Sequence, residues 1–247
     1  RYDGSLGVLC GLEVLRCYQQ GGQLLPCHLE VISFTDEEGS VFSMLGSRAF
    51  AGLLSPDDLA GASNQTALNE GLQRLHLTKD SILQARRDPD SVAAFLEVHI
   101  EQGTRLEEAQ LDIGMVTDIV GIRRFELTFT GQAAHAGTMP MARRSDALWA
   151  TADFVLKARD SINEQFFPGV VNCGQISIPN SAPNIVPATV RLMLEFRHGS
   201  DALLDAMEQK LLDIAQACAQ VAAVSLDIQH DSTIKPVGLD ADLLTVA

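Results

Sequence analysis

The 247-residue chain has little positive charge and no closely spaced cysteines. Its 18 Lys and Arg residues are outnumbered by 32 Asp and Glu residues, which gives a formal net charge of −14. A surface this acidic repels phosphate backbones, so nucleic acid is not an expected partner. The five cysteines form no CxxC pair, a pattern typical of separate thiols in a reducing compartment and not of a disulfide framework.

Long apolar runs and targeting patterns are also lacking. No run approaches the length needed to cross a bilayer, so we expect no membrane partner. No signal-peptide pattern opens the chain, and we expect a cytoplasmic protein. The chain nevertheless begins at Arg1 without a Met and stops inside an apparent element at residues 243–247. We therefore interpret it as a fragment, in which missing targeting signals prove little.

The short motifs of common hydrolases are absent as well. No HExxH, CxxC or GxSxG sequence occurs, so no single motif settles the chemistry. The composition, 46% hydrophobic and 20% charged, is that of a globular protein with enough chain for one large or two modest domains.

The first half of the chain alternates helical and extended patterns. Apolar residues recur at helical spacing over residues 5–20, and two glycines end this predicted helix. Residues 29–35 and 95–100 are short β-rich runs, and acidic or imidazole side chains lie at the end of each. Apolar strands alternating with helices predict an α/β sheet, in which functional groups collect at the carboxyl ends of the strands.

The second half has the order of a separate small domain. Strands are predicted at four places and helices at two, namely residues 123–130, 142–160 (helix), 170–178, 189–197, 202–220 (helix) and 224–229. The order β-α-β-β-α-β is that of a ferredoxin-like split βαβ module. We assign residues 1–117 to a first domain, 118–231 to this module, and 232–247 to a return into the first domain.

Acidic and imidazole side chains stand out at Asp3, at Glu37 and Glu38, and at His99. Neighbouring carboxylates in a cleft repel each other unless a cation lies between them, and a pair of divalent metal ions would remove that repulsion. Carboxylate oxygens and imidazole nitrogens suit Zn, Mn or similar ions. One carboxylate bridging two ions, with a second kept free as general base, would make a hydrolase that activates water on metal.

Each of these stretches also has an ordinary structural interpretation. Asp3 followed by glycine is typical of a turn or a helix N-cap. Residues 36–39 alone are typical of a solvated acidic loop. A histidine such as His99 on an apolar strand is more often a satisfied core residue than a metal ligand.

Taken together, however, the stretches resemble the M20 metallohydrolase family. In detail they resemble its carbamoylase branch of N-carbamoyl-L-amino-acid hydrolases, allantoate amidohydrolases and ureido hydrolases such as β-ureidopropionase. The resemblance covers essentially the whole chain. Its segments are residues 1–8 (RYDGSLGV), 35–40 (TDEEGS), 97–103 (EVHIEQG), 131–141 (GQAAHAGTMPM), 144–148 (RSDAL), 183–187 (PNIVP) and 195–197 (EFR).

The resemblance implies a partial dinuclear-metal catalytic domain of α/β class, into which the split βαβ module is inserted as a lid and dimerisation domain. Two divalent ions, Zn or Mn with Co or Ni as alternatives, would share Asp3 as a bridging ligand. Glu38 would bind one ion and His99 the other. Glu37 would act as the general base, and Gln102 would line the pocket.

The resemblance also assigns roles in the module. His135 would polarise the scissile carbonyl, reaching across from the partner in a homodimer. Asn184 and Arg197 would hold the carboxylate of a small-molecule substrate, and a guanidinium does fit a carboxylate bidentately. On the residues alone, Arg197 equally fits a surface ion pair and Asn184 an ordinary turn. Small residues flank His135, which favours an exposed imidazole.

The family has one more metal-binding His upstream of the position of Asp3 and another His near its C-terminus, and neither lies in this chain. We expect the fragment by itself to bind metal weakly and to turn over no substrate.

The leading hypothesis is hydrolysis of carbamoyl or ureido C–N bonds, as in N-carbamoyl-L-amino acids or allantoate. One alternative is a dinuclear-metal peptidase or deacylase on the same fold, and the wording of residues 135–140 favours the carbamoylase branch over it. The other is a non-catalytic dimerisation fragment, against which the presence of Asp3, Glu37, Glu38 and His99 argues. The sequence leaves open the substrate, the native metal and the stereochemical preference.

Overall fold

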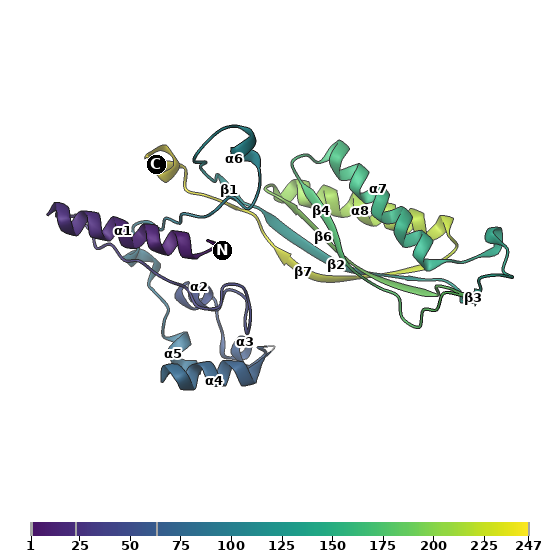
Figure 1. Ribbon diagram of the computed structural model, residues 1–247, viewed down its shortest axis with the longest axis horizontal. Coiled ribbons are helices and arrows are strands. Elements are labelled where there is room, and N and C mark those ends of the chain that lie inside the picture. Colours follow the sequence, from purple (N-terminus) through teal and green to yellow (C-terminus); the bar gives the residue numbers. More distant parts are fainter. Residues whose placement is uncertain (1, 23, 63, 247) are drawn as a thin grey trace. The chain divides into compact units, whose positions relative to one another are not determined.

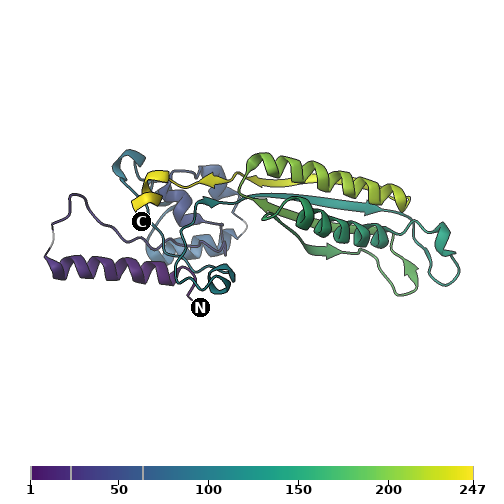
Figure 2. The same ribbon diagram turned by 90° about the horizontal axis from the view of Figure 1, so that it is seen from above.

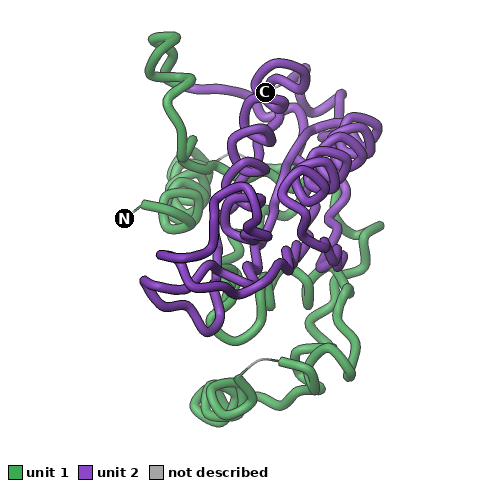
Figure 3. The backbone as a smooth tube through the Cα atoms, turned by 90° about the vertical axis from the view of Figure 1, so that its right-hand side faces the viewer, with its two compact units in different colours: residues 1–112 green, residues 113–247 purple. Residues whose placement is uncertain are grey.

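The computed structural model describes residues 2–22, 24–62 and 64–246 (Figure 1). The chain divides into two compact units, residues 1–112 (unit 1) and 113–247 (unit 2), coloured separately in Figure 3. The observed division falls slightly before the predicted boundary at residue 117, and residues 232–246 belong to unit 2. Residues 1 and 247, at the outer ends of the predicted domains, lie outside the described residues.

Unit 1 consists of helices joined by long irregular segments. The helices are α1 Ser5–Gly21, α2 Leu45–Phe50, α3 Pro56–Ala60, α4 Gln65–Leu75, α5 Lys79–Leu83, the 3₁₀ helix Pro89–Ser91 and α6 Arg105–Glu108. Local caps explain where the short helices begin: Ser55 with Asp58 and Thr78 with Ser81 form capping boxes at α3 and α5. A small core of Leu45, Leu59, Ala62 and Leu68 joins α2, α3 and α4.

The predicted strands at residues 29–35 and 95–100 are wrong. Both segments lack regular secondary structure, and no described residue of unit 1 belongs to a β-strand. The apolar patterns are real, since the rings of Phe34 and Phe95 lie 6.3 Å apart and bring the two segments near each other. A strand exists, however, only where its backbone pairs with another strand, and the described part of unit 1 supplies no such ladder.

Unit 2 is built on a four-stranded antiparallel sheet with the order β4-β6-β2-β7. Its strands are β2 Gly121–Thr130, β4 Val170–Ser177, β6 Thr189–His198 and β7 Ser225–Ile234. The helices α7 Ala147–Gln165 and α8 Asp201–Val221 lie on one face of this sheet (Figures 1 and 2). The chain order β2-α7-β4-β6-α8-β7 is the predicted β-α-β-β-α-β order.

Alternation along the central strands separates the two faces of the sheet. On β2 the buried side chains Phe125, Leu127 and Phe129 alternate with half-buried ones, as expected for a strand with one covered face. The buried set packs with Phe154 of α7, Met207 of α8 and the inward residues of β6 into the main core. The opposite face of the sheet, which we call the outer face, is mostly polar and carries Arg124, Glu126, Glu195 and Arg197.

Two short two-stranded sheets accompany the four-stranded one. The strand β3 Ala134–His135 pairs with β5 Ile185–Val186, and β1 Asp118–Ile119 pairs with β8 Val237–Gly238. The helix α9, Ala241–Val246, follows β8, and the 3₁₀ helix Met141–Arg143 precedes α7. Within the described ranges, none of the helices is long and apolar enough to span a membrane.

The fold of unit 2 makes one stability prediction. Leu127→Ala removes a side chain that is fully buried in the main core, so the free energy of unfolding should fall by about 2–5 kcal/mol. Leu156→Ala on α7, where the side chain is 53% exposed, should change it by less than about 1 kcal/mol. Trp149 is the only tryptophan and lies in α7, so its fluorescence in urea reports on unit 2. Equal midpoints for the two variants would contradict the assigned core.

Candidate functional site

Three of the residues predicted for the metal site and pocket meet in unit 1, around the Asp3 carboxylate. One of its oxygens, Oδ1, lies 3.0 Å from Nε2 of His99. The other, Oδ2, accepts a hydrogen bond from the Gln102 side-chain amide. Residues from opposite ends of unit 1 therefore form one cluster, the Asp3 cluster, consisting of Asp3, His99 and Gln102.

The first turns of α1 bring these residues together. Gly4 precedes the helix with a φ of 68°, a backbone conformation that suits glycine. Gly7 then faces the segment that carries His99, and a Cβ atom there would lie only 2.6 Å from the carbonyl oxygen of Val98. The glycine spacing thus lets the start of α1 approach the backbone beside His99. Gln102 also has a positive φ of 55°, which turns the chain directly after His99.

The imidazole of His99 is oriented by its own backbone. Its Nδ1 atom lies 2.7 Å from the carbonyl oxygen of Ile100, which can only accept, so Nδ1 carries a hydrogen. In the neutral ring Nε2 then presents a lone pair to the Asp3 carboxylate. Two acceptors 3.0 Å apart need a proton or a cation between them.

A raised pKa of His99 reflects the same arrangement. The hydrogen bond to the Ile100 carbonyl contributes most, burial opposes it, and the negative charges of Asp3, Glu97 and Glu37 add to it. Without a metal ion, the imidazolium form satisfies the contact with Asp3.

Asp3 and His99 suit a divalent ion in place of that proton. Metal–oxygen and metal–nitrogen bonds are about 2.0–2.2 Å long, so two ligands of one ion lie roughly 3 Å apart. The free nitrogen of a histidine whose other nitrogen donates to a carbonyl is the usual metal-facing atom. Within the described residues, however, no group of three or more His, Cys, Asp and Glu side chains is arranged to hold a metal ion. Glu38 is therefore not brought to Asp3 and His99.

The acidic loop that carries Glu37 and Glu38 is organised by Asp36. The Asp36 carboxylate accepts hydrogen bonds from the backbone N–H groups of Ser40, Val41 and Phe42, at 2.7, 3.0 and 2.8 Å. Burial alone would raise the pKa of Asp36, and these three bonds outweigh it and lower the pKa. Sequence analysis did not single out Asp36 as a site residue. Its position at the start of a turn is the sequence feature that could have predicted these hydrogen bonds, because aspartate side chains often accept from the backbone of the turn that follows them.

Glu37 and Glu38 take no part in these hydrogen bonds. Both are exposed, and in the described part of the chain neither carboxylate has a hydrogen bond or an ion pair. Glu37 lies close enough to His99 to raise its pKa by charge. The loop therefore fixes its backbone through Asp36 and leaves both glutamates free to act.

In unit 2, the structure brings His135 and Asn184 together. The short strands β3 and β5 pair His135 with Ile185, and the N–H of Ala136 donates to the Asn184 carbonyl at 2.9 Å. The N–H of Gly137 donates to His135 Nδ1 at 3.1 Å, so Nε2 carries the hydrogen of the neutral ring. The ring is exposed, as predicted, and its Nε2–H is free to donate.

The loop around His135 is held by residues that sequence analysis quoted without a role. Arg144 donates from Nη2 to the Ala136 carbonyl at 2.6 Å and from Nε to the Met139 carbonyl at 3.2 Å. Gly131 packs against the Ser145 carbonyl so closely that a Cβ atom would collide with it. Through these contacts the segments that contain Gly131 and Arg144 hold the backbone of the turn that carries His135.

Arg197 lies at the other end of the sheet. Thr189 begins β6 beside Thr130, and Arg197 comes eight residues later, opposite Ile122. At about 3.3 Å per residue this is roughly 26 Å along the strand. The expectation that Asn184 and Arg197 hold one carboxylate is therefore not met within a single chain.

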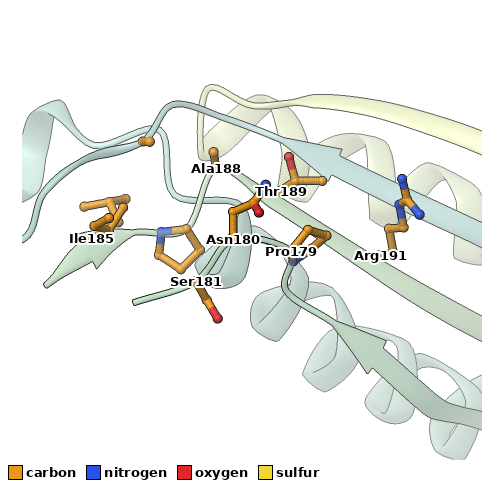
Figure 4. Close-up of a pocket in the computed structure, with 10 residues that line it drawn as sticks. Pro179, Asn180, Ser181, Ile185, Ala188, Thr189 and Arg191 are labelled. Carbon is orange, nitrogen blue, oxygen red and sulfur yellow. The ribbon is translucent and has the colours of Figure 1, made fainter. Parts of the chain in front are cut away.

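A cavity of about 420 Å³ lies beside β5 and the start of β6 (Figure 4). Its lining is largely apolar and includes Pro179, Ile185, Val186 and Pro187, with Arg191 at one side. It adjoins Asn184 in sequence but contains none of the predicted site residues.

The geometry of the Asp3 cluster gives a prediction on titration. His99 should titrate above the ordinary histidine pKa, and Asp3→Asn should lower the pKa only in part, because the bond to the Ile100 carbonyl remains. The raised pKa stabilises the folded chain at low pH, and this contribution is lost as the pH rises through the folded pKa. Ring-carbon NMR shifts measure it. Asp57→Asn on α3 is the control, and an unchanged pKa in Asp3→Asn would contradict the contact.

Comparison with known proteins identifies the family of the chain. The model of the peptidase family M20/M25/M40 matches residues 1–245. An N-carbamoyl-L-amino acid amidohydrolase of Geobacillus stearothermophilus is 34% identical over 239 residues, which are 96% of this chain and 58% of the relative. An allantoate deiminase of Arabidopsis thaliana is 31% identical over 278 residues, covering 100% of this chain and 53% of the relative.

A solved structure agrees with these relatives. A hydantoinase/carbamoylase family amidase from Burkholderia ambifaria matches with a TM-score of 0.87 and 34% identity, over 99% of this chain and 59% of that one. The chain thus spans less than two thirds of the proteins it matches. The predicted resemblance to the M20 family and its carbamoylase branch is confirmed. Because the family model matches nearly all of its residues, the chain belongs to the peptidase family M20/M25/M40.

Proposed function

We propose that the chain forms part of a metal-dependent hydrolase that cleaves carbamoyl or ureido C–N bonds in small carboxylate-bearing substrates. N-carbamoyl-L-amino acids and allantoate-like compounds are the substrate class, since relatives are named for both. The observation that carries the proposal is the contact of 3.0 Å between Asp3 Oδ1 and His99 Nε2, two acceptors that a divalent ion would satisfy.

Asp3, His99 and Glu38 are the residues that would hold two divalent ions. For Glu38 this requires the exposed acidic loop to move its side chain toward the other two ligands. Zn or Mn suits oxygen and nitrogen ligands of this kind, with Co or Ni as alternatives. When bound, such ions lower the pKa of water and polarise a carbonyl.

Glu37 is proposed as the general base. Its carboxylate is exposed, free of partners in the described residues, and near His99. It takes a proton from the attacking water and returns a proton to the leaving nitrogen, so the same carboxylate serves both halves of the reaction. Gln102, bonded to Asp3, would hold that ligand in place at the edge of the pocket.

His135 is proposed to stabilise the oxyanion. The N–H of Gly137 fixes the tautomer in which Nε2 carries the hydrogen, and the exposed ring can therefore donate to the oxygen of the scissile carbonyl as negative charge develops there. Arg144 supports this role indirectly, because it ties down the carbonyls on both sides of the turn.

The distance between Arg197 and the His135–Asn184 turn favours a site shared by two chains. A substrate with only a few atoms between carboxylate and scissile carbonyl cannot bridge roughly 26 Å of strand β6. Arg197 of one copy and the turn of another can meet on one substrate if the protein is a homodimer through unit 2, acting as the lid and dimerisation domain. Arg197 would then hold the carboxylate, while Asn184 and His135 of the second copy would hold the carbamoyl end.

The general-base role is tested with Glu37→Gln in the protein expressed with any coding sequence that flanks these residues. The carboxamide cannot take a proton, so kcat for an N-carbamoyl-L-amino acid should fall by about 10²–10⁴-fold. Metal content by elemental analysis should stay unchanged, because Glu37 is not a proposed ligand. Glu70→Gln on α4 is the control. Retained turnover in Glu37→Gln, or hydrolysis of dipeptides in preference to N-carbamoyl amino acids and allantoate, would reject the proposal.

The shared site is tested by mixing two inactive variants. His135→Ala and Arg197→Ala chains, unfolded and refolded together, should regain about a quarter of wild-type activity, because half the random dimers carry one complete site. His135→Ala mixed with Asn184→Ala is the matched control. In this control both substitutions affect the same turn, so every site lacks either His135 or Asn184. No dimer then has a complete site, and activity should stay absent. Recovery in both mixtures, or in neither, would contradict the arrangement.

A further inference from the structure

Arg197 is part of a three-residue ion cluster on the outer face of the sheet. Oε1 of Glu195, two residues before it on β6, accepts a hydrogen bond from Arg197 Nε at 2.7 Å and lies 2.6 Å from Nη2 of the same guanidinium. Its other oxygen, Oε2, accepts from Nε of Arg124 at 2.6 Å. Arg124 lies directly opposite Glu195 on β2, so the sheet register builds this contact.

The cluster leaves one edge of the Arg197 guanidinium open. A guanidinium has a side edge, formed by Nε and one Nη, and an end edge, formed by its two Nη groups, and each can grip a carboxylate bidentately. Glu195 occupies the side edge. Within the described residues no hydrogen bond or ion pair involves Nη1, so this group and the second hydrogen of Nη2 remain available for another carboxylate. The Arg197 side chain is 43% exposed, which gives a ligand access.

Glu195 is well placed to hold that geometry. Its side chain is only 17% exposed, and both of its oxygens are engaged by guanidinium groups. Burial alone would raise its pKa, but the bonds from Arg124 and Arg197 outweigh it and lower the pKa. Ile122 and Val170, the cross-strand neighbours of Arg197, offer no competing polar partner.

The net charge of the cluster also favours binding of an anion. A single Glu195–Arg197 pair would be neutral and would attract an anion weakly. Arg124 adds a second positive charge, so two guanidinium groups and one carboxylate leave the cluster at about +1. An anion approaching the open edge of Arg197 thus meets a net attraction in spite of the carboxylate beside it.

We propose that Glu195 is a positioning residue that presents the end edge of Arg197 to the substrate carboxylate, and that Arg124 keeps this site cationic. The inference rests on the proposed function of Arg197 and deepens it. Glu195 has two opposing effects on anion binding. Its negative charge weakens the attraction for an anion, whereas its hydrogen bond to Arg197 orients the guanidinium and strengthens binding.

Glu195→Gln decides between these effects. If charge alone governed binding, removal of a carboxylate beside the site would strengthen the binding of an anion. On our proposal the amide cannot receive both guanidinium groups, Arg197 loses its fixed orientation, and binding weakens by about five- to tenfold. Glu126→Gln is the matched control: it makes the same change of charge on the same face, on β2, at a side chain without a hydrogen bond or ion pair in the described residues.

The experiment is an NMR titration of the protein, expressed with any coding sequence that flanks these residues, with N-carbamoylglycine, following the Nε–Hε signals of arginine. Arg197 should give a resolved, slowly exchanging signal, assigned by its loss in Arg197→Lys. This signal should broaden or move to the solvent-exposed position in Glu195→Gln and stay unchanged in Glu126→Gln. Arg124→Gln should keep the signal, because the Glu195–Arg197 contact remains, and should still weaken binding through the lost charge.

Each outcome bears on a different step. Binding to Glu195→Gln as tight as to wild type, or an Arg197 signal that stays resolved there, would overturn the positioning role. Unchanged binding to Arg124→Gln would overturn the role of Arg124. If N-carbamoylglycine shifts no signal in the wild-type chain, the proposed function of Arg197 fails, while the signal in Glu195→Gln still decides whether Glu195 orders it. Thermal unfolding of each variant shows whether unit 2 remains folded.

Discussion

The contact between Asp3 and His99 is the constraint on which the proposed chemistry depends. Because Nδ1 of His99 is committed to a backbone carbonyl, its Nε2 lone pair faces a carboxylate oxygen at 3.0 Å. That arrangement is unfavourable unless something positive lies between the two atoms. A proton satisfies it, as the raised pKa of His99 indicates, and so would a divalent cation. The glycines before and within the first turns of α1 place Asp3 where this choice arises.

Much of unit 2 could be predicted from the sequence because its information is local. Phe125, Leu127 and Phe129 alternate with polar residues along β2, and Leu204, Met207 and Leu211 recur at helical spacing along α8. These patterns are visible within each segment, whichever element it packs against, and the order of strands and helices could be predicted from them. Boundaries moved by a few residues where a cap or a cross-strand partner decided them. Asp146, for example, caps α7 and starts the helix later than its composition suggests.

Unit 1 shows where such inference fails. Residues 29–35 and 95–100 have the composition of strands. A strand, however, forms only when its backbone pairs with a second segment, and the sequence of one segment does not show whether that partner is present. The same limit applied to Asp36, whose three backbone hydrogen bonds depend on how the loop turns back on it. It applied again to Arg197 and Asn184, since their separation follows from the register of β6 against β2. The family motifs include these residues or adjacent ones, but motifs alone do not give the distances between them.

Strand β6 connects the two ends of this molecule's proposed chemistry. Arg197 lies near its carboxyl end, and Asn184 shortly precedes its amino end, so the strand between them, paired with β2 along its whole length and with β4 over most of residues 191–197, sets their separation. No loop movement at either end can bring both to one small substrate, because the strand is hydrogen-bonded on both sides within the sheet. Unit 2 therefore carries one of the proposed binding elements at each end. A homodimer would use both ends at once, and the Arg197 guanidinium held by Glu195 at one end would then face an imidazole and an amide from the other copy.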